Sequence, residues 1–225
     1  MHEPQVAPLG IQGPKATELA ARIWGDQVRD IRFFRYKRVD VHGTPMILAR
    51  SGFSAQGGFE LYFEGADGAA IWNDLMEAGR DLDVRAGSPI QAERVEAGLL
   101  SYLADITPDM TPLEAGLGKL CELDEDLGCV GWDALREKRA PERQLRPIEI
   151  EGAPLPPQSV FWDVTAGGRR VGRISSCCRA HSFDCNAAIG LIDASHWEPG
   201  TALVVHTPDG PRDAVVREKF WRMLK

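Results

Sequence analysis

The amino-acid sequence changes character near residue 142, and this change constrains the fold more than any other feature of the chain. Before it, segments with helical apolar periodicity alternate with short strand-like runs. After it, only short strand-like runs remain, and glycine and proline turns separate them. Such runs predict a small antiparallel barrel or sandwich. We therefore predict an α+β chain with two domains, residues 1–142 and 147–225, and a boundary near 143–147.

The spacing of apolar residues places the individual elements. Pro14 precedes a helical apolar stripe, where a helix start tolerates proline, and His42-Gly43 forms a turn between two strands. Helices are predicted over residues 15–24, 69–78, from Pro89 onward, and over 133–139. The inner side of the second helix is predicted to consist of Ile71, Trp72, Leu75 and Met76. Strands are predicted over residues 32–41, 44–49, 59–64, 159–165, 170–175, 187–192, 202–206 and 214–218.

Composition and charge exclude several classes of protein. Hydrophobic residues make up 44% of the chain and charged residues 26%, which is ordinary for a globular domain. No apolar run approaches the ~20 residues that a membrane-spanning helix needs, and the N-terminus lacks a secretory signal, so we expect a cytoplasmic protein without a membrane partner. A net charge of −7 argues against nucleic acid as the main partner.

The cysteines raise the question of a metal site. Cys177, Cys178, His181 and Cys185 lie within nine residues, so a metal ion is conceivable there. A zinc site usually needs paired ligands, and the chain contains no Cys-x-x-Cys pair. The surrounding sequence is more typical of a loop that leads into a buried strand, where cysteine is a common core residue. We predict no metal, and reduced thiols because the five cysteines are an odd number in an unsecreted chain.

The strand over residues 59–64 carries the most informative side chains. Alternation assigns Phe59, Leu61 and Phe63 to the core face. The opposite face then displays Glu60 beside Tyr62, directly after the glycine-rich loop 51–58. A carboxylate can accept paired hydrogen bonds from a flat heterocycle with adjacent N–H donors, and a nearby tyrosine can stack or donate. A solvated strand face with no ligand is the other interpretation of the same spacing.

The helix predicted to begin at Pro89 holds a second candidate. Ser88 is expected to cap it, and Arg94 and Gly98 are neighbours on its surface because they lie four residues apart. Arg94 would hold either a ligand carboxylate or an internal acid such as Glu96 or Glu60. Glycine inside a helix is unfavourable by ~1 kcal/mol relative to alanine, so Gly98 suggests a close approach of another backbone or a ligand.

Several ordered motifs together resemble one family. They are Gln12-Gly13-Pro14-Lys15, RSGFSAQGGFE over residues 50–60, ERVEAGLLSY over 93–102, PLEAGL over 112–117, VGWDAL over 130–135, and the segment from Val171-Gly172 to Ala188-Ile189. They resemble the glycine-cleavage T-protein, or aminomethyltransferase, superfamily. The Ser-Gly…Gln-Gly-Gly-Phe-Glu form is most similar to the tetrahydrofolate-dependent dimethylsulfoniopropionate demethylases. The resemblance covers nearly the whole chain.

The resemblance implies a fold and a site. The family fold is a cloverleaf of three domains around a tetrahydrofolate channel, with a ferredoxin-like α/β part and a C-terminal antiparallel β-barrel. It implies that Glu60, Arg94 and Phe53 bind the cofactor tetrahydrofolate, and that Tyr62 lies beside the substrate as a candidate catalytic residue. Phe53 takes a loop position that is tryptophan in dimethylsulfoniopropionate demethylases. Sulfonium, sarcosine-like, dimethylglycine-like and aryl methyl ether substrates therefore all remain open.

The resemblance also implies a function and a partner. We expect a transferase that moves a methyl group from a small methylated substrate to tetrahydrofolate. Family members carry a substantial segment before the Gln-Gly-Pro motif, whereas Met1 lies only eleven residues before Gln12 here. We expect a second chain to supply that part; self-association as a homo-oligomer, or a non-catalytic folate-binding or structural subunit, are the alternatives.

Overall fold

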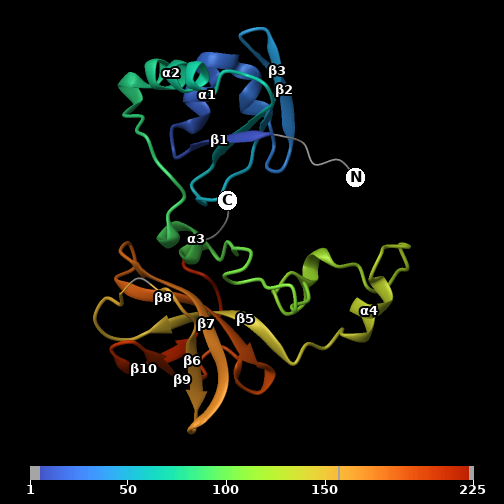
Figure 1. Cartoon of the computed structure of the whole chain (residues 1–225), viewed down its shortest axis with the longest axis vertical. Coiled ribbons are helices and arrows are strands. Elements are labelled where there is room, and N and C mark those ends of the chain that lie inside the picture. Colours follow the sequence, from blue (N-terminus) through green and yellow to red (C-terminus); the bar gives the residue numbers. More distant parts are fainter. Residues whose placement is uncertain (1–5, 157, 223–225) are drawn as a thin grey trace. The chain divides into compact units, whose positions relative to one another are not determined.

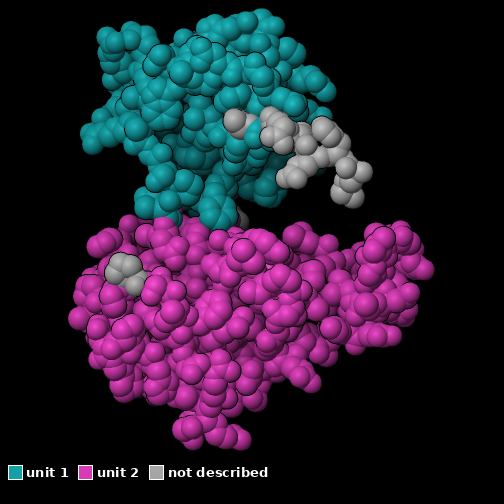
Figure 2. Space-filling model, viewed as in Figure 1, with its two compact units in different colours: residues 1–90, 224–225 teal, residues 91–223 magenta. Residues whose placement is uncertain are grey.

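The computed structural model describes residues 6–156 and 158–222 of the chain. These residues form two compact units, one ending at Ile90 and the other beginning at Gln91 (Figure 2). In the described part of the chain, no helix combines the length and apolar character needed to cross a membrane. We describe each unit by itself.

The N-terminal unit is a four-stranded antiparallel sheet with two helices on one face (Figure 1). Its elements are β1 (Ala7–Gln12), α1 (Ala16–Trp24), the 3₁₀ turn η1 (Asp26–Asp30), β2 (Tyr36–Val41), β3 (Thr44–Ala49), β4 (Gly58–Phe63), α2 (Gly68–Ala78) and η2 (Arg80–Leu82). The strand order is β1-β4-β3-β2. The helix layer packed on one face of an antiparallel sheet agrees with the predicted ferredoxin-like part. The order of elements differs, because β4 precedes α2 in this chain, whereas the last strand follows the second helix in a ferredoxin-like fold.

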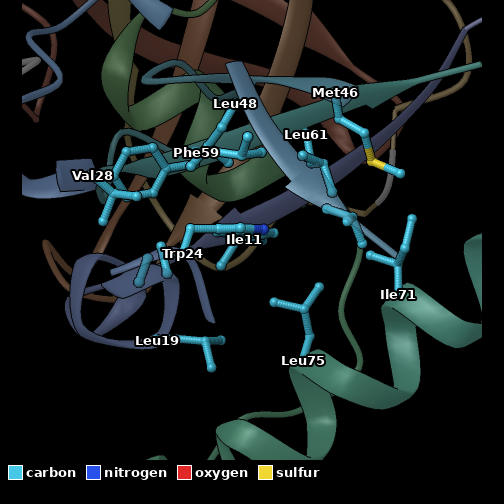
Figure 3. Close-up of a cluster of buried hydrophobic side chains, with 14 of the residues drawn as sticks. Ile11, Leu19, Trp24, Val28, Met46, Leu48, Phe59, Leu61, Ile71 and Leu75 are labelled. Carbon is cyan, nitrogen blue, oxygen red and sulfur yellow. The ribbon is translucent and has the colours of Figure 1, made fainter. Parts of the chain in front are cut away.

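The core of this unit lies between the sheet and the helices. The inward faces of the strands pack against one stripe from each helix, with Leu19 from α1 and Leu75 from α2 among the buried residues (Figure 3). Phe59 and Leu61 are fully buried and Phe63 packs against the same cluster, which confirms the predicted core face of β4. Trp72 is 38% exposed, so its predicted place on the inner side of α2 is wrong.

The turn between β2 and β3 is confirmed. His42 has a φ of 52° and Gly43 a φ of 80°, and positive values at both central residues define the turn whose twist matches a β-hairpin. The ring nitrogen Nε2 of His42 lies 2.7 Å from a carboxylate oxygen of Asp74 in α2. The hairpin is therefore tied to a helix at its tip.

The C-terminal unit contains a closed six-stranded antiparallel barrel with the order β10-β5-β8-β7-β6-β9. It begins with α3 (Gln91–Ala97), η3 (Gly118–Leu120) and α4 (Trp132–Glu137). The barrel consists of β5 (Arg143–Ile150), β6 (Trp162–Ala166), β7 (Arg169–Ala180), β8 (Cys185–Asp193), β9 (Ala202–Thr207) and β10 (Gly210–Val216), with η4 (Ala194–His196) between β8 and β9. The α+β class and the C-terminal antiparallel barrel are confirmed.

The predicted domain boundary can be compared with two positions in the structure. The first barrel strand, β5, begins at Arg143, so it starts inside the predicted boundary region 143–147. The compact units divide at Ile90, and the chain from Gln91 to the barrel belongs to the barrel's unit. The two-domain division at residue 142 stays a prediction.

Two expectations about α3 are wrong. The helix begins at Gln91 instead of at Pro89, and it ends at Ala97, so Gly98 lies outside it. Gly98 has a φ of 70°, and a Cβ atom there would come within 2.4 Å of the Phe220 ring. Glycine is needed at this position both for the left-handed backbone and for the close approach of an aromatic side chain.

Candidate functional site

A carboxylate held by two hydroxyl groups lies on the open face of the N-terminal sheet. Glu60 points away from the core because its neighbours in β4, Phe59 and Leu61, point into it. The hydroxyls of Ser51 and Tyr62 both donate to the same oxygen of Glu60, Oε2, and the Tyr62 oxygen lies 3.1 Å from it. The other oxygen, Oε1, has no hydrogen-bond donor among the described residues. The structure thus fixes the orientation of the carboxylate and leaves one of its oxygens available.

The loop that carries Ser51 is anchored by one side chain from another strand. The Gln12 amide nitrogen, at the end of β1, donates to the carbonyl oxygens of Ser51 at 3.1 Å and Phe59 at 2.9 Å. The Gln12 amide oxygen accepts from the hydroxyl of Ser54 at 2.9 Å. One amide therefore joins β1, the loop and β4, and it brings together two motifs that lie about forty residues apart in the sequence.

Two glycines make this anchoring possible. A Cβ atom on Gly52 would lie 1.9 Å from the Gln12 amide oxygen. A Cβ atom on Gly58 would lie 2.1 Å from the carbonyl oxygen of Ile11, and Gly58 also has a φ of 137°. Only glycine lets the loop and the start of β4 approach β1 this closely.

Tyr62 is held as a hydrogen-bond donor. Partial burial raises the pKa of its phenol above the ordinary value, and the nearby Glu60 carboxylate raises it further. A tyrosine with a raised pKa keeps its proton at neutral pH, and this proton is directed at Glu60. The arrangement makes Tyr62 an orienting group for the carboxylate, and its catalytic role stays a prediction.

The remaining predicted site residues lie in two different places. Phe53 belongs to the same loop as Ser51, and 36% of its surface is exposed, so its ring is accessible to a ligand. Arg94 belongs to the other unit, where its guanidinium group forms an ion pair of 2.7 Å with buried Asp105. The alternative of an internal ion pair is confirmed for Arg94, although its acid is neither Glu96 nor Glu60.

Arg94 has few donors left for a ligand. It also donates to the Gln91 side chain at 3.0 Å, to the Leu99 carbonyl at 3.2 Å and to the Ser176 hydroxyl at 2.6 Å. Guanidinium has five N–H groups, and these contacts together with Asp105 use four of them. Its cofactor-binding role stays a prediction that these contacts do not support.

Sequence reasoning missed several residues of these clusters, among them Gln12, Ser51 and Asp105. Gln12 was recognised only as part of a motif, and Ser51 only as part of a glycine-rich loop. Asp105 lies in an irregular segment, and no periodicity marks it as buried. One signal was available for Gln12. It is a polar residue at the end of a strand, directly after the apolar residue Ile11.

The cysteine cluster forms part of the barrel. Cys177 and Cys178 lie in β7, and Cys185 begins β8, which pairs with it. Burial raises the pKa of the Cys177 and Cys178 thiols to about 12, so both stay protonated at neutral pH. Among residues 6–156 and 158–222, no three histidine, cysteine or acidic side chains gather as a metal site would require.

Comparison with known proteins identifies this architecture. The crystal structure of glycine cleavage system aminomethyltransferase T from Bartonella henselae matches 99% of this chain with a TM-score of 0.81 and 22% sequence identity, and the match covers 61% of that protein. The chain therefore has the fold of the matched part of an aminomethyltransferase. Residues 2–125 match the GCVT N-terminal domain, residues 143–221 match the glycine cleavage T-protein C-terminal barrel domain, and the chain belongs to this family.

Two curated relatives are similar along almost the whole chain. Dimethylsulfoniopropionate demethylase DmdA from Ruegeria pomeroyi is 52% identical over 223 residues, which cover 98% of this chain and 60% of the relative. An aminomethyltransferase from Caldanaerobacter subterraneus is 30% identical over 220 residues, which cover 96% of this chain and 58% of the relative. The chain thus spans about 60% of the length of these relatives.

Proposed function

We propose that this chain binds tetrahydrofolate through Glu60 and takes part in moving a methyl group from a small methylated substrate to that cofactor. The observation that carries the proposal is the Glu60 carboxylate, of which one oxygen is fixed by Ser51 and Tyr62 while the other is open. Membership of the T-protein family and similarity to a demethylase support it. The reaction would place the protein in cytoplasmic one-carbon metabolism.

The site residues fit one edge of the cofactor. A pterin ring presents adjacent N–H donors, and the open oxygen of Glu60 is an acceptor for them. When bound, tetrahydrofolate supplies the nitrogen N5 that accepts the one-carbon unit. The contribution of this chain is placement, because holding two reactants in the right geometry supplies a large part of the rate enhancement.

The substrate class follows from the charge of its methylated atom. A sulfonium or a quaternary ammonium carries its own activated leaving group, so its reaction needs no strong acid from the protein. Phe53 is an exposed aromatic ring on the site loop and would contact such a cation through its face, less strongly than tryptophan would. We favour a sulfonium substrate because the 52% identical relative is a dimethylsulfoniopropionate demethylase. Sarcosine-like, dimethylglycine-like and ether substrates are the competitors.

We also propose that catalysis requires a further polypeptide part. The curated relatives extend beyond the matched region by about 40% of their length, as the 60% coverage shows. A second chain that supplies this part would make the present chain one subunit of a split enzyme. A non-catalytic folate-binding or structural subunit is the alternative, and it predicts folate binding, or assembly, without turnover.

The direct test is calorimetric titration with tetrahydrofolate under anaerobic conditions, using the chain alone and the chain mixed with the product of any adjacent reading frame. Glu60→Gln keeps the shape and removes the charge. Loss of a charged hydrogen bond should weaken binding by roughly 10- to 100-fold. Glu64→Gln, an exposed neighbour one residue beyond β4, is the matched control and should bind as the unmodified chain does.

The outcomes separate the alternatives. Binding that is lost in Glu60→Gln and retained in Glu64→Gln supports the pterin site. Binding that appears only with the second polypeptide supports a split enzyme, and binding without methyl transfer from any tested donor supports the non-catalytic alternative. No binding under either condition would refute the folate proposal.

A further inference from the structure

The side-chain amide of Gln12 is directed entirely at one loop of the N-terminal unit. Gln12 ends β1 and is exposed, yet its Nε2 donates to the carbonyls of Ser51 at 3.1 Å and Phe59 at 2.9 Å. Its Oε1 accepts from the Ser54 hydroxyl at 2.9 Å. Ordering a long surface side chain is unfavourable in conformational entropy. Three hydrogen bonds from one amide therefore indicate that the position of this amide is specified.

The two carbonyl groups that accept from Gln12 belong to residues that determine where the Glu60 carboxylate lies. Phe59 directly precedes Glu60 in β4, so its carbonyl is part of the peptide group that leads into Glu60. Ser51 donates its hydroxyl to Oε2 of Glu60, while its carbonyl is held by Gln12. Gln12 thus fixes the backbone next to Glu60 and also the residue that orients its carboxylate.

The orientation of the Gln12 amide is set by Ser54. Ser54 is 7% exposed, and its hydroxyl accepts from the backbone amide of Gln56 at 3.2 Å while it donates to Oε1 of Gln12. An amide rotated by half a turn would direct its oxygen at two carbonyl oxygens, acceptor against acceptor. Only one orientation of the amide therefore satisfies all of its partners, and neither a carboxylate nor an apolar side chain can replace it.

The backbone supports the same attachment. Gly13, the residue after Gln12, donates its N–H to the carbonyl oxygen of Gly57 at 2.9 Å, and Gln12 pairs with Gly58 where β1 meets β4. The loop over residues 51–58 is thus attached to the end of β1 at its start, in its middle and at its end. The position of the loop therefore depends on a strand end that lies outside the loop.

We propose that Gln12 is a positioning residue, which sets the affinity of the site for tetrahydrofolate by holding the Glu60 carboxylate in the orientation that binds. The inference rests on the proposed function, in which the open oxygen of Glu60 accepts from the pterin edge. Gln12 acts through Ser51 and Phe59, because both protons of its amide are already donated to them. An acceptor that is ordered before the ligand arrives binds more tightly, since binding does not have to order it.

The test replaces the amide with a side chain of similar length. Gln12→Met removes all three hydrogen bonds and changes no charge. The same substitution at Gln27 is the matched control, because Gln27 is also an exposed glutamine of the N-terminal unit and its side-chain amide donates to a backbone carbonyl, that of Trp24, at 3.0 Å. Ser54→Ala is a milder second variant, which keeps the amide and removes the bond that orients it.

Binding of tetrahydrofolate is measured by anaerobic calorimetry, under whichever condition the unmodified chain binds, alone or with the further polypeptide. Gln12→Met should weaken binding roughly tenfold, Ser54→Ala should weaken it less, and Gln27→Met should leave it unchanged. The key result is a double-mutant cycle with Glu60→Gln. Because Gln12 acts through Glu60, Gln12→Met should weaken binding by less than about threefold in a chain that already carries Glu60→Gln.

A measurement without ligand separates this inference from the proposed function. The Gly13 amide, which donates to Gly57, should lose at least about tenfold of its protection against hydrogen exchange in Gln12→Met and keep it in Gln27→Met. An unmodified chain that binds no tetrahydrofolate refutes the proposed function, and the exchange result then still decides whether Gln12 holds the loop.

Three results would overturn the positioning role of Gln12. The first is unchanged protection of Gly13 in Gln12→Met. The second is tetrahydrofolate binding by Gln12→Met that equals that of Gln27→Met. The third is an equal loss of binding with and without Glu60→Gln, which would mean that Gln12 supports the fold as a whole.

Discussion

Two carboxylates in this molecule have opposite surroundings. The Asp105 side chain in the C-terminal unit is fully buried, and both of its oxygens are satisfied: Arg94 and the Ser101 amide donate to one, and the hydroxyls of Ser175 and Ser176 donate to the other. Glu60 in the N-terminal unit is half-buried, and its two donors share a single oxygen. Neither carboxylate could be assigned its role from residue type alone.

The difference separates a carboxylate whose two oxygens both accept hydrogen bonds from one whose donors, among the described residues, reach a single oxygen. The donors around Asp105 come from α3, from the segment after it and from β7, so the ion pair joins three parts of one unit. Both oxygens of Asp105 already accept hydrogen bonds from these donors, so Asp105 has no acceptor position left for a ligand. The donors around Glu60 come from one strand and one loop. They orient the carboxylate and occupy only one of its two oxygens.

Removing the Asp105 charge should have the largest effect on stability. Asp105→Asn leaves the Arg94 guanidinium buried without its counterion, and breaking a buried pair in this way is destabilising by about 3–5 kcal/mol. Urea unfolding of the variant, followed by a signal from the C-terminal unit, measures the effect. Asp163→Asn removes the partner of an exposed ion pair with Arg170 and should leave the midpoint nearly unchanged. Equal effects of the two substitutions would show that Asp105 is not a structural anion.

Neutralising Glu60 should have a much smaller effect on stability than on binding. Glu60→Gln leaves the hydroxyls of Ser51 and Tyr62 with an amide oxygen to donate to, so the free energy of unfolding should change by less than about 1 kcal/mol. Urea unfolding of Glu60→Gln measures this change in the free energy of unfolding. A loss of stability as large as that of Asp105→Asn would mean that Glu60 serves the fold, and it would contradict the contrast drawn above.

The smallest effect should be the alkaline pH dependence contributed by Tyr62. Its pKa is raised in the folded chain, so the unfolded chain loses this proton first, near the ordinary tyrosine value of about 10. The corresponding stability is present below that pH and is lost as the pH rises above it. The stability difference between the unmodified chain and Tyr62→Phe should therefore shrink above about pH 10. A difference that is constant with pH would argue against the Glu60–Tyr62 contact.

The sequence predicted those parts of the fold that local pattern determines. The alternation from Phe59 to Phe63 correctly placed Glu60 and Tyr62 together, and His42-Gly43 correctly marked a hairpin. The strands β1 and β5 were missed because Pro8 and Pro147 interrupt their patterns. Pro8 is tolerated because β1 lies at the edge of its sheet.

Long-range contacts could not be predicted in the same way. The partner of Arg94 is Asp105, eleven residues away in an irregular segment, and the hydroxyls that complete the network come from β7. Gly98 was assigned to a helix because the spacing of an apolar face continues past it to Leu99 and Tyr102. Its surroundings are instead set by Phe220, at the other end of the unit. Such pairings depend on the tertiary fold, which one sequence does not display.

The amide of Gln12 holds the loop at fixed points, so the position of Glu60 does not depend on the loop side chains that lie between these points. It fixes the ends of the loop, at Ser51, Ser54 and Phe59, and thereby the position of Glu60. The side chains of Phe53 and Ala55 lie between these fixed points and take part in none of its bonds. Under the proposed function, exchange of these two side chains would change the groups offered to a methylated substrate, while Gln12 would still hold Glu60 in place.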